Sequence, residues 1–242
     1  MGSCMVEKFK YFIDLNEDEE KLLLKLEEQT EQYKSGETIR SKGSKMDDIH
    51  VISSGWTFTS SDIDKDIRTI FDIRLDGDFA GIGEISYDEY IYDLVALTNV
   101  EVCPFPKRNL NDIFQKSDKL CRAFYAILSR EHMLMSERVI SLGRRTAIEK
   151  VAHLILEIRI RMDSIGCSDT EDNAFPITQN HIADILGLSS VQVSRSMNEL
   201  RNNQYIKYGQ NELTILQKEK LYDLALFPKN FNMRPNTEWH TS

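Results

Sequence analysis

The side chains best suited to chemistry lie in the stretch ITQNHIADILGLSSVQVSRSMNEL, residues 177–200. Its second half spaces Ser190, Ser194 and Arg195 so that two hydroxyls and a guanidinium would emerge from one side of a helix. A guanidinium can donate paired hydrogen bonds to a guanine edge, and serine can contact any base. This pattern favours a helix that enters the major groove of DNA, with outward positions Ser190, Val191, Ser194, Arg195 and Asn198.

Two short helices joined by a tight turn would position that surface. Thr178 and Ser189 are suitable N-caps, and Gly187 can adopt the left-handed conformation that the reversal requires. The following YIKYGQNELTIL predicts a β-hairpin with a turn near Gly209. Apolar residues at steps of three and four are expected to face inward, namely Ile182, Ala183, Ile185, Leu186, Val193, Met197 and Leu200.

The N-terminal part of the chain differs in glycine content and in the spacing of its apolar residues. Residues 36–83 hold six of the 11 glycines, and the segment RTIFDIRL alternates Thr69, Phe71, Ile73 and Leu75 with polar residues. Alternation with a period of two predicts short strands. A small antiparallel barrel or sandwich is therefore expected, followed by helices through residue 165.

A heptad pattern between residues 121 and 142 predicts a helix that pairs with a copy of itself. An amphipathic helix packed on its own barrel is the alternative. We interpret His132 as an interface histidine rather than a metal or haem ligand. A hinge is expected at Gly143, before a capping box of Thr146 and Glu149 that would start the next helix. The seam positions are Cys121, Tyr125, Leu128, His132, Met135, Val139 and Leu142.

Charge is distributed unevenly along the 242 residues. The formal net charge is -9, but residues 1–116 carry 14 Lys and Arg against 24 Asp and Glu, whereas residues 143–242 carry 12 of each class. The acidity therefore belongs to the N-terminal part, and it does not exclude a nucleic-acid surface at the other end.

Several function classes lack support in the sequence. The four cysteines show no C-x-x-C spacing, which argues against a zinc site, an iron-sulfur cluster or a disulfide framework. We find no P-loop, nucleophile elbow or metal-ligand spacing, so neither catalytic residues nor an enzyme is predicted. No apolar run approaches the roughly 20 residues of a membrane helix, and no secretory signal is visible. A cytoplasmic protein is expected.

The order of these features resembles the Crp/Fnr superfamily of bacterial transcription regulators, from about Phe9 to Ile215. The motifs that carry the resemblance are GDFAG at 77–81, SERV at 136–139, the stretch 177–195 and the hairpin. The resemblance implies an α+β fold with a cyclic-nucleotide-binding-like β-roll (a double-stranded β-helix), a long dimerisation helix and a winged helix-turn-helix. The expected boundaries are 1–116, 117–142 and 143–225, followed by a tail at 226–242.

The resemblance also implies a homodimer that binds palindromic double-stranded DNA and contacts RNA polymerase. Thr178 and Asn180 fall where the family contacts phosphates. Val191 departs from the family, because many members carry there a glutamate that reads a G·C pair. The positions that face bases are Ser190, Val191, Ser194 and Arg195, and further phosphate or wing contacts are expected at Gln192, Asn198, Lys207 and Tyr208.

The effector site looks degenerate when compared with cyclic-nucleotide members. In those members helix-end amides and an arginine hold the phosphate, in a segment that follows a Gly-Glu pair and ends in Arg-Ser. Here Ile82 stands at the glutamate, Tyr92 at the arginine and Asp93 at the serine, so a phosphate would lack charge compensation. We predict that cAMP is not the effector. The degenerate pocket comprises Gly81, Ile82, Gly83, Tyr92 and Asp93.

No cofactor is predicted, although haem or another small effector remains an alternative. Haem would need an axial ligand, and no histidine stands in a context that selects it. A dimeric ligand-sensing or protein-interaction module with a degenerate helix-turn-helix is the alternative function. The candidate haem ligands are His50, His132, His153, His181 and His240.

Overall fold

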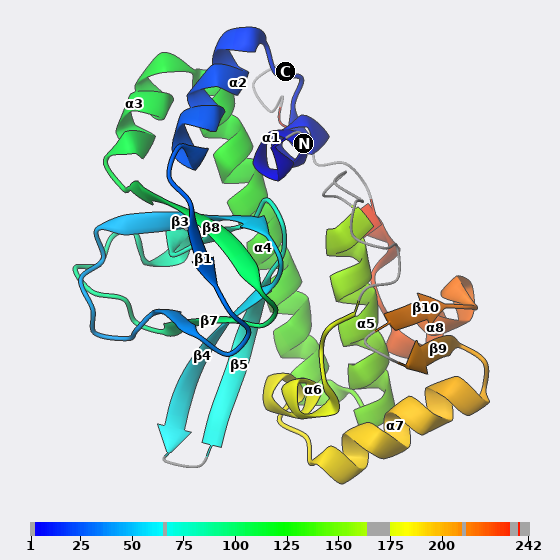
Figure 1. The fold of residues 1–242 in the computed structure, drawn as a ribbon. Coiled ribbons are helices and arrows are strands. Elements are labelled where there is room, and N and C mark those ends of the chain that lie inside the picture. Colours follow the sequence, from blue (N-terminus) through cyan, green and yellow to red (C-terminus); the bar gives the residue numbers. More distant parts are fainter. Residues whose placement is uncertain (1–2, 65–66, 164–174, 210–211, 233–236, 238–242) are drawn as a thin grey trace. The chain divides into compact units, whose positions relative to one another are not determined.

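The computed structural model of the 242-residue chain is described here except at residues 1–2, 65–66, 164–174, 210–211, 233–236 and 238–242 (Figure 1). The described residues form two compact units, the first made mainly of the chain up to Ser129 and the second made mainly of the chain from Arg130 onward. The predicted α+β class, with a β-roll, a long helix and a winged helix-turn-helix, is confirmed. The described helices include none that is both long and apolar enough to cross a membrane.

The first unit contains two antiparallel sheets and a layer of helices. One sheet has the strand order β1-β8-β3-β6 and the other β2-β7-β4-β5. Figure 1 shows β4 and β5 as a long hairpin. The elements are α1 Cys4–Phe12, α2 Glu17–Leu24, η1 Lys25–Glu27, β1 Glu31–Tyr33, β2 Thr38–Arg40, β3 Asp48–Ser54, β4 Thr57–Asp64, β5 Ile67–Arg74, β6 Phe79–Ala80, η2 Ile82–Glu84, β7 Asp93–Ala96, β8 Val100–Pro106, α3 Asn109–Lys116 and the start of α4 Asp118–Arg144.

Two apolar clusters hold this unit together. Ile52 and Ala80 from one sheet pack with Leu94 from the other, so one cluster fills the space between the sheets. The second lies between the first sheet and the helices, where the ring of Phe124 on α4 contacts Phe79 with centroids 5.1 Å apart. The long helix is therefore anchored to the roll by its N-terminal turns.

One glycine in the roll cannot be replaced without rearrangement. Gly55 lies between β3 and β4 with a φ of 87°. A Cβ at this position would collide with the carbonyl oxygen of Asn99. Both the left-handed backbone and this close approach require glycine.

The roll buries a histidine that the sequence left unassigned. His50 on β3 is fully buried, and burial first, then the charge of Arg40, lowers its pKa to about 3. Its register partner on β6 is Ala80, which belongs to the cluster between the sheets. His50 is therefore a neutral side chain of the roll interior at physiological pH.

The second unit is built around α5. This helix buries both apolar and polar side chains and packs against α6, α7 and α8. Figure 1 shows α7 and the hairpin of β9 and β10 beside it. The elements are the end of α4, α5 Ala147–Asp163, α6 Gln179–Leu186, α7 Ser190–Asn202, β9 Ile206–Gly209, β10 Glu212–Ile215, α8 Lys218–Ala225 and η3 Lys229–Asn232.

A buried ion pair connects α4 to α5 within this unit. The Nε of Arg138 donates to Glu157 at 3.1 Å, and a second guanidinium nitrogen also contacts that carboxylate. The side chains are 5% and 1% exposed. Because a buried charge is costly without a well-placed partner, this pair constrains how the two helices meet.

The break between the helices differs from the prediction. Helix α4 continues through Gly143 to Arg144, and the N–H of Arg145 still donates to Ser141. The chain breaks at Arg145 and Thr146, where the Thr146 N–H donates to Glu149 at 2.8 Å. The capping interaction was predicted, but the expected hinge at Gly143 was wrong, because the exposed glycine keeps its helical hydrogen bonding.

The first residues of the C-terminal tail contact the short segment between α4 and α5, called here the α4–α5 joint, and α5 itself. Arg145 donates to the carbonyl of Leu226 at 2.9 Å, and the ring of Phe227 lies 4.6 Å from that of His153. Both rings are buried, and burial lowers the pKa of His153 to about 4. The sequence left open whether the tail docks, and the structure shows that its first residues do.

Removing one partner of the buried pair should destabilise the protein strongly. Glu157→Ala leaves the Arg138 charge buried without its partner carboxylate, so we expect a loss of about 3–5 kcal/mol in the free energy of unfolding. Urea denaturation followed by circular dichroism measures this loss. The double variant Arg138→Met, Glu157→Leu is the control and should recover most of the stability. A single variant within about 1 kcal/mol of the parent would contradict the assigned role.

Candidate nucleic-acid interface

Helix α6 begins and ends at residues whose local interactions fix its length. The hydroxyl of Thr178 accepts from the N–H of His181 at 3.2 Å, and the Thr178 N–H is directed at the Nδ1 of His181. Gly187 ends the helix with a φ of 61°. The predicted cap and turn are confirmed. The role of His181 as the reciprocal partner was not predicted, because this position of a capping box is usually glutamate or glutamine.

Helix α7 has a complete capping box. Ser189 accepts from the N–H of Gln192 at 3.3 Å, while the side-chain oxygen of Gln192 accepts from the Ser189 N–H at 2.9 Å. The cap on Ser189 confirms the prediction. The sequence suggested only a DNA contact for Gln192, but its carboxamide oxygen belongs to the cap. Its NH₂ group is then the part that can donate to a ligand.

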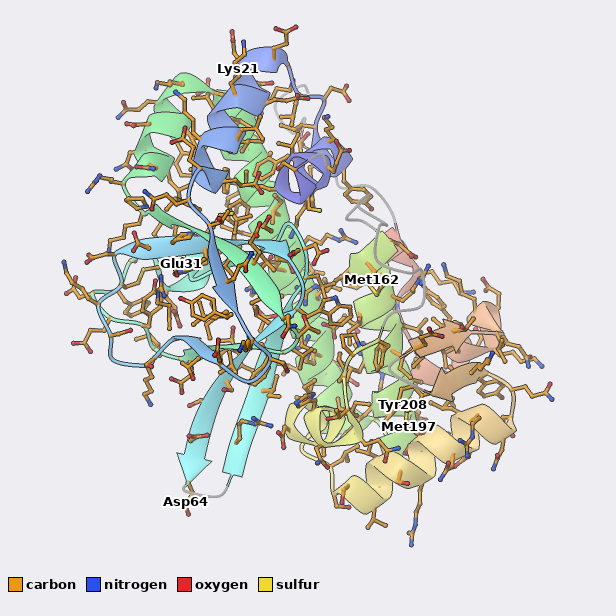
Figure 2. All side chains as sticks on the ribbon, viewed as in Figure 1. Lys21, Glu31, Asp64, Met162, Met197 and Tyr208 are labelled. Atoms are coloured by element: carbon orange, nitrogen blue, oxygen red, sulfur yellow. The ribbon has the colours of Figure 1, made fainter. Side chains whose placement is uncertain are left out.

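The two sides of α7 divide as the spacing predicts. Val193, Met197 (labelled in Figure 2) and Leu200 are buried. The five positions expected to point outward are accessible to different degrees. Val191 is 56% exposed, Ser194 is half-buried, and Ser190, Arg195 and Asn198 are exposed. The helix therefore presents polar groups and one accessible apolar side chain on a surface that its own unit does not cover.

A further arginine lies on α7 beyond the predicted residues. The guanidinium of Arg201 donates to the side-chain oxygen of Asn198 at 2.8 Å, and both residues are exposed. Sequence reasoning assigned Asn198 to DNA and passed over Arg201. The three-residue spacing between them is the signal that could have identified the pair.

The hairpin after α7 matches the predicted wing. Strands β9 and β10 pair in antiparallel register, and Lys207 is exposed. Tyr208 is half-buried, its hydroxyl lies 3.5 Å from the carbonyl oxygen of Ile177, and burial raises its pKa. Tyr208, labelled in Figure 2, belongs to the same unit as α7. Lys207 is thus the more available of the two predicted wing residues, while Thr178 and Asn180 are exposed at the start of α6.

The stretch predicted to form a degenerate effector pocket contains the short 3-10 helix η2. Gly81 has a φ of 88° and precedes η2, where Ile82 is buried and Gly83 is exposed. The ring of Tyr92 contacts that of Phe71, with centroids 4.3 Å apart.

Two carboxylates in and beside this stretch, those of Asp93 and Glu84, interact with backbone N–H groups. Asp93 accepts from the backbone N–H of Lys42 at 2.9 Å. The carboxylate of Glu84 is partly buried, which raises its pKa, although the N–H groups of Ile91 and Tyr92 oppose that shift. Across the described residues, His, Cys, Asp and Glu do not gather in groups of three that could hold a metal.

The seam side of α4 is largely uncovered in the single chain. Tyr125 is 67% exposed and Val139 is 63% exposed. Leu128 and Leu142 are also exposed, and Met135 is half-buried. Cys121 and His132 are exposed as well. The alternative in which this stripe packs on its own barrel is wrong, because side chains on the other side of the helix, such as Phe124, make those contacts.

Comparison with known proteins identifies the family. Residues 30–117 match the cyclic nucleotide-binding domain, and residues 149–224 match the Crp-like helix-turn-helix domain. The nitrogen fixation regulation protein FixK of Bradyrhizobium diazoefficiens is 28% identical over 194 residues, 80% of each chain. The transcriptional activator FnrA of Stutzerimonas stutzeri is 26% identical over 192 residues, 79% of this chain and 78% of that protein.

The same fold occurs in a solved structure, that of FixK2 from Bradyrhizobium japonicum. The TM-score is 0.71 at 21% identity, over 81% of this chain and 96% of that one. The fold and the two matched domains define a DNA-binding transcription regulator rather than an enzyme. The chain belongs to the Crp/Fnr family.

Proposed function

We propose that this regulator is a homodimer that binds palindromic DNA through α7 of each protomer, without a cyclic nucleotide. The observation that carries the proposal is the exposed side of α7, where Arg195 stands one turn from Val191 above a buried apolar stripe. A helix of this kind reads base edges when it lies in the major groove. Thr178, Asn180, Gln192 and Lys207 would contact the backbone around it.

Dimerisation through α4 follows from the exposed seam. Apolar side chains at heptad spacing gain stability when they pack against an identical helix. A palindromic site then matches the two-fold symmetry of the dimer, with one α7 for each half-site. Contact with RNA polymerase and a cytoplasmic location are further parts of the proposal that rest on family membership. The domain boundaries at 116, 142 and 225 are proposed on the same basis.

Charge on the seam should separate the protomers. Leu128→Glu combined with Val139→Glu would bury carboxylates in the dimer, whereas both positions are exposed in one chain and tolerate charge there. Sedimentation velocity at micromolar concentration should give a dimer for the parent and a monomer for this variant. Leu24→Glu on α2, at a residue 46% exposed, is the matched control and should stay dimeric. A monomeric parent would show that the seam does not pair.

Cyclic nucleotides should neither bind nor alter DNA affinity. Tyr92 and Asp93 replace the arginine and serine that a buried phosphate would need, and the added carboxylate repels it. An effector changes DNA affinity only if it binds the two conformations of the regulator differently. Calorimetric titration with cAMP and with cGMP should therefore give no saturable heat. Micromolar binding of either nucleotide would contradict this part of the proposal.

Two substitutions on α7 should have different effects on base recognition. Arg195→Ala should cost about 1–3 kcal/mol at the specific site and little on random DNA, because a bidentate contact to guanine is lost. Val191→Glu restores an acceptor for a cytosine amino group, so preference at one symmetric base pair should shift towards G·C. Selection from random oligonucleotides measures both effects.

The same selection tests the alternative function. If the parent enriches no motif and fails to shift its native upstream DNA, the chain is better described as a dimeric sensing or interaction module with a degenerate helix-turn-helix. If the parent and both variants enrich one identical motif, DNA is bound but α7 does not read the bases.

A further inference from the structure

Arg201 stands at the C-terminal end of α7, away from the residues expected to face bases. Helical residues advance by about 100° each, so Arg201 lies within about 20° of Ser190 and of Ser194 around the helix axis. Glu199, the acidic residue of this helix, lies about 140° from Ser194. Arg201 therefore continues the same side of α7 and adds positive charge to it.

The position of Arg201 along the helix indicates what it can reach. Arg201 lies eleven positions after Ser190, which corresponds to about 16 Å of helix, whereas the major groove is about 12 Å wide. Recognition helices place their N-terminal residues against base edges. With Ser190 and Val191 at the bases, the far end of α7 lies over the rim of the groove, where the accessible groups are phosphates.

The side chain of Arg201 is also oriented by a hydrogen bond before any phosphate binds. The Asn198 oxygen accepts one guanidinium N–H at 2.8 Å, and the remaining donors of Arg201 stay available. A guanidinium can hold a phosphate through two parallel hydrogen bonds. Restricting its rotation before binding reduces the entropy lost when the complex forms.

We propose that Arg201 is a phosphate contact at the rim of the major groove and that Asn198 is a positioning residue that acts through it. This inference rests on the proposed DNA-binding function and extends it beyond the residues that read bases. It assigns Asn198 an indirect role, where the sequence suggested that Asn198 touches phosphate itself.

The salt dependence of binding tests the contact. Each phosphate neutralised contributes about -0.9 to the slope of log K against log salt, so Arg201→Ala in both protomers should reduce the slope by about 1.8. The DNA is a duplex carrying the motif that the parent selects. The enriched motif should stay unchanged, because phosphates carry no sequence information.

Two variants control for charge alone. Arg201→Lys keeps the cation and should retain most of the slope. Lys220→Ala removes an exposed cation from α8, outside the helix pair, and should leave the slope near that of the parent. An unchanged slope for Arg201→Ala, or a changed motif, would overturn the phosphate contact. If the parent itself binds no DNA, the proposed function fails, which is a distinguishable result.

A double-mutant cycle tests the role of Asn198. Asn198→Ala leaves the charge in place, so the slope should persist while affinity falls about two- to tenfold through lost preorganisation. In the Arg201→Ala background, the same substitution should have no further effect. Additive losses would mean that Asn198 contacts DNA independently and would overturn its positioning role.

Discussion

The ion pair between Arg138 and Glu157 is the main buried polar constraint on the arrangement of α4 and α5 in the second unit. The two side chains come from α4 and α5, and water is excluded from both. Since an unpaired charge in this position is costly, placements of the helices that separate the two groups are disfavoured. Helix α5 in turn packs against α7. The pair therefore links the helix that carries the proposed dimer seam to α5, which packs against the helix whose exposed residues are proposed to face DNA.

The two functional surfaces are stabilised in different ways. The structure of the α7 surface is stabilised by contacts between residues close in sequence, such as the capping box of Ser189 and Gln192. It can be formed before any ligand arrives, which favours rapid and specific docking. The α4 seam is incomplete in one chain, because residues such as Tyr125 and Val139 remain exposed. In the proposed function, DNA recognition is thus a local property of each protomer, whereas the proposed two-fold symmetry requires a second copy.

Features set by short-range spacing could be predicted from the sequence. The caps at Thr178 and Ser189 and the turn at Gly187 follow from residue type. Contacts between distant residues could not be predicted. Nothing in the spacing matches Arg138 with Glu157, 19 residues apart. The sequence placed the hinge at Gly143, two residues before the observed break after α4. Glycine permits a hinge without requiring one, so residue type alone could not locate the break.

The backbone at Leu226 bears on how this protein should be handled. Leu226 adopts a left-handed conformation with a φ of 49°, although it is not a glycine. Its carbonyl oxygen accepts a hydrogen bond from Arg145, and the next residue, Phe227, packs against His153 and Phe231. The end of α8 is therefore a poor place to join a purification tag or a fluorescent reporter. Recombinant forms should retain the chain through Phe231, so that the α4–α5 joint keeps these contacts.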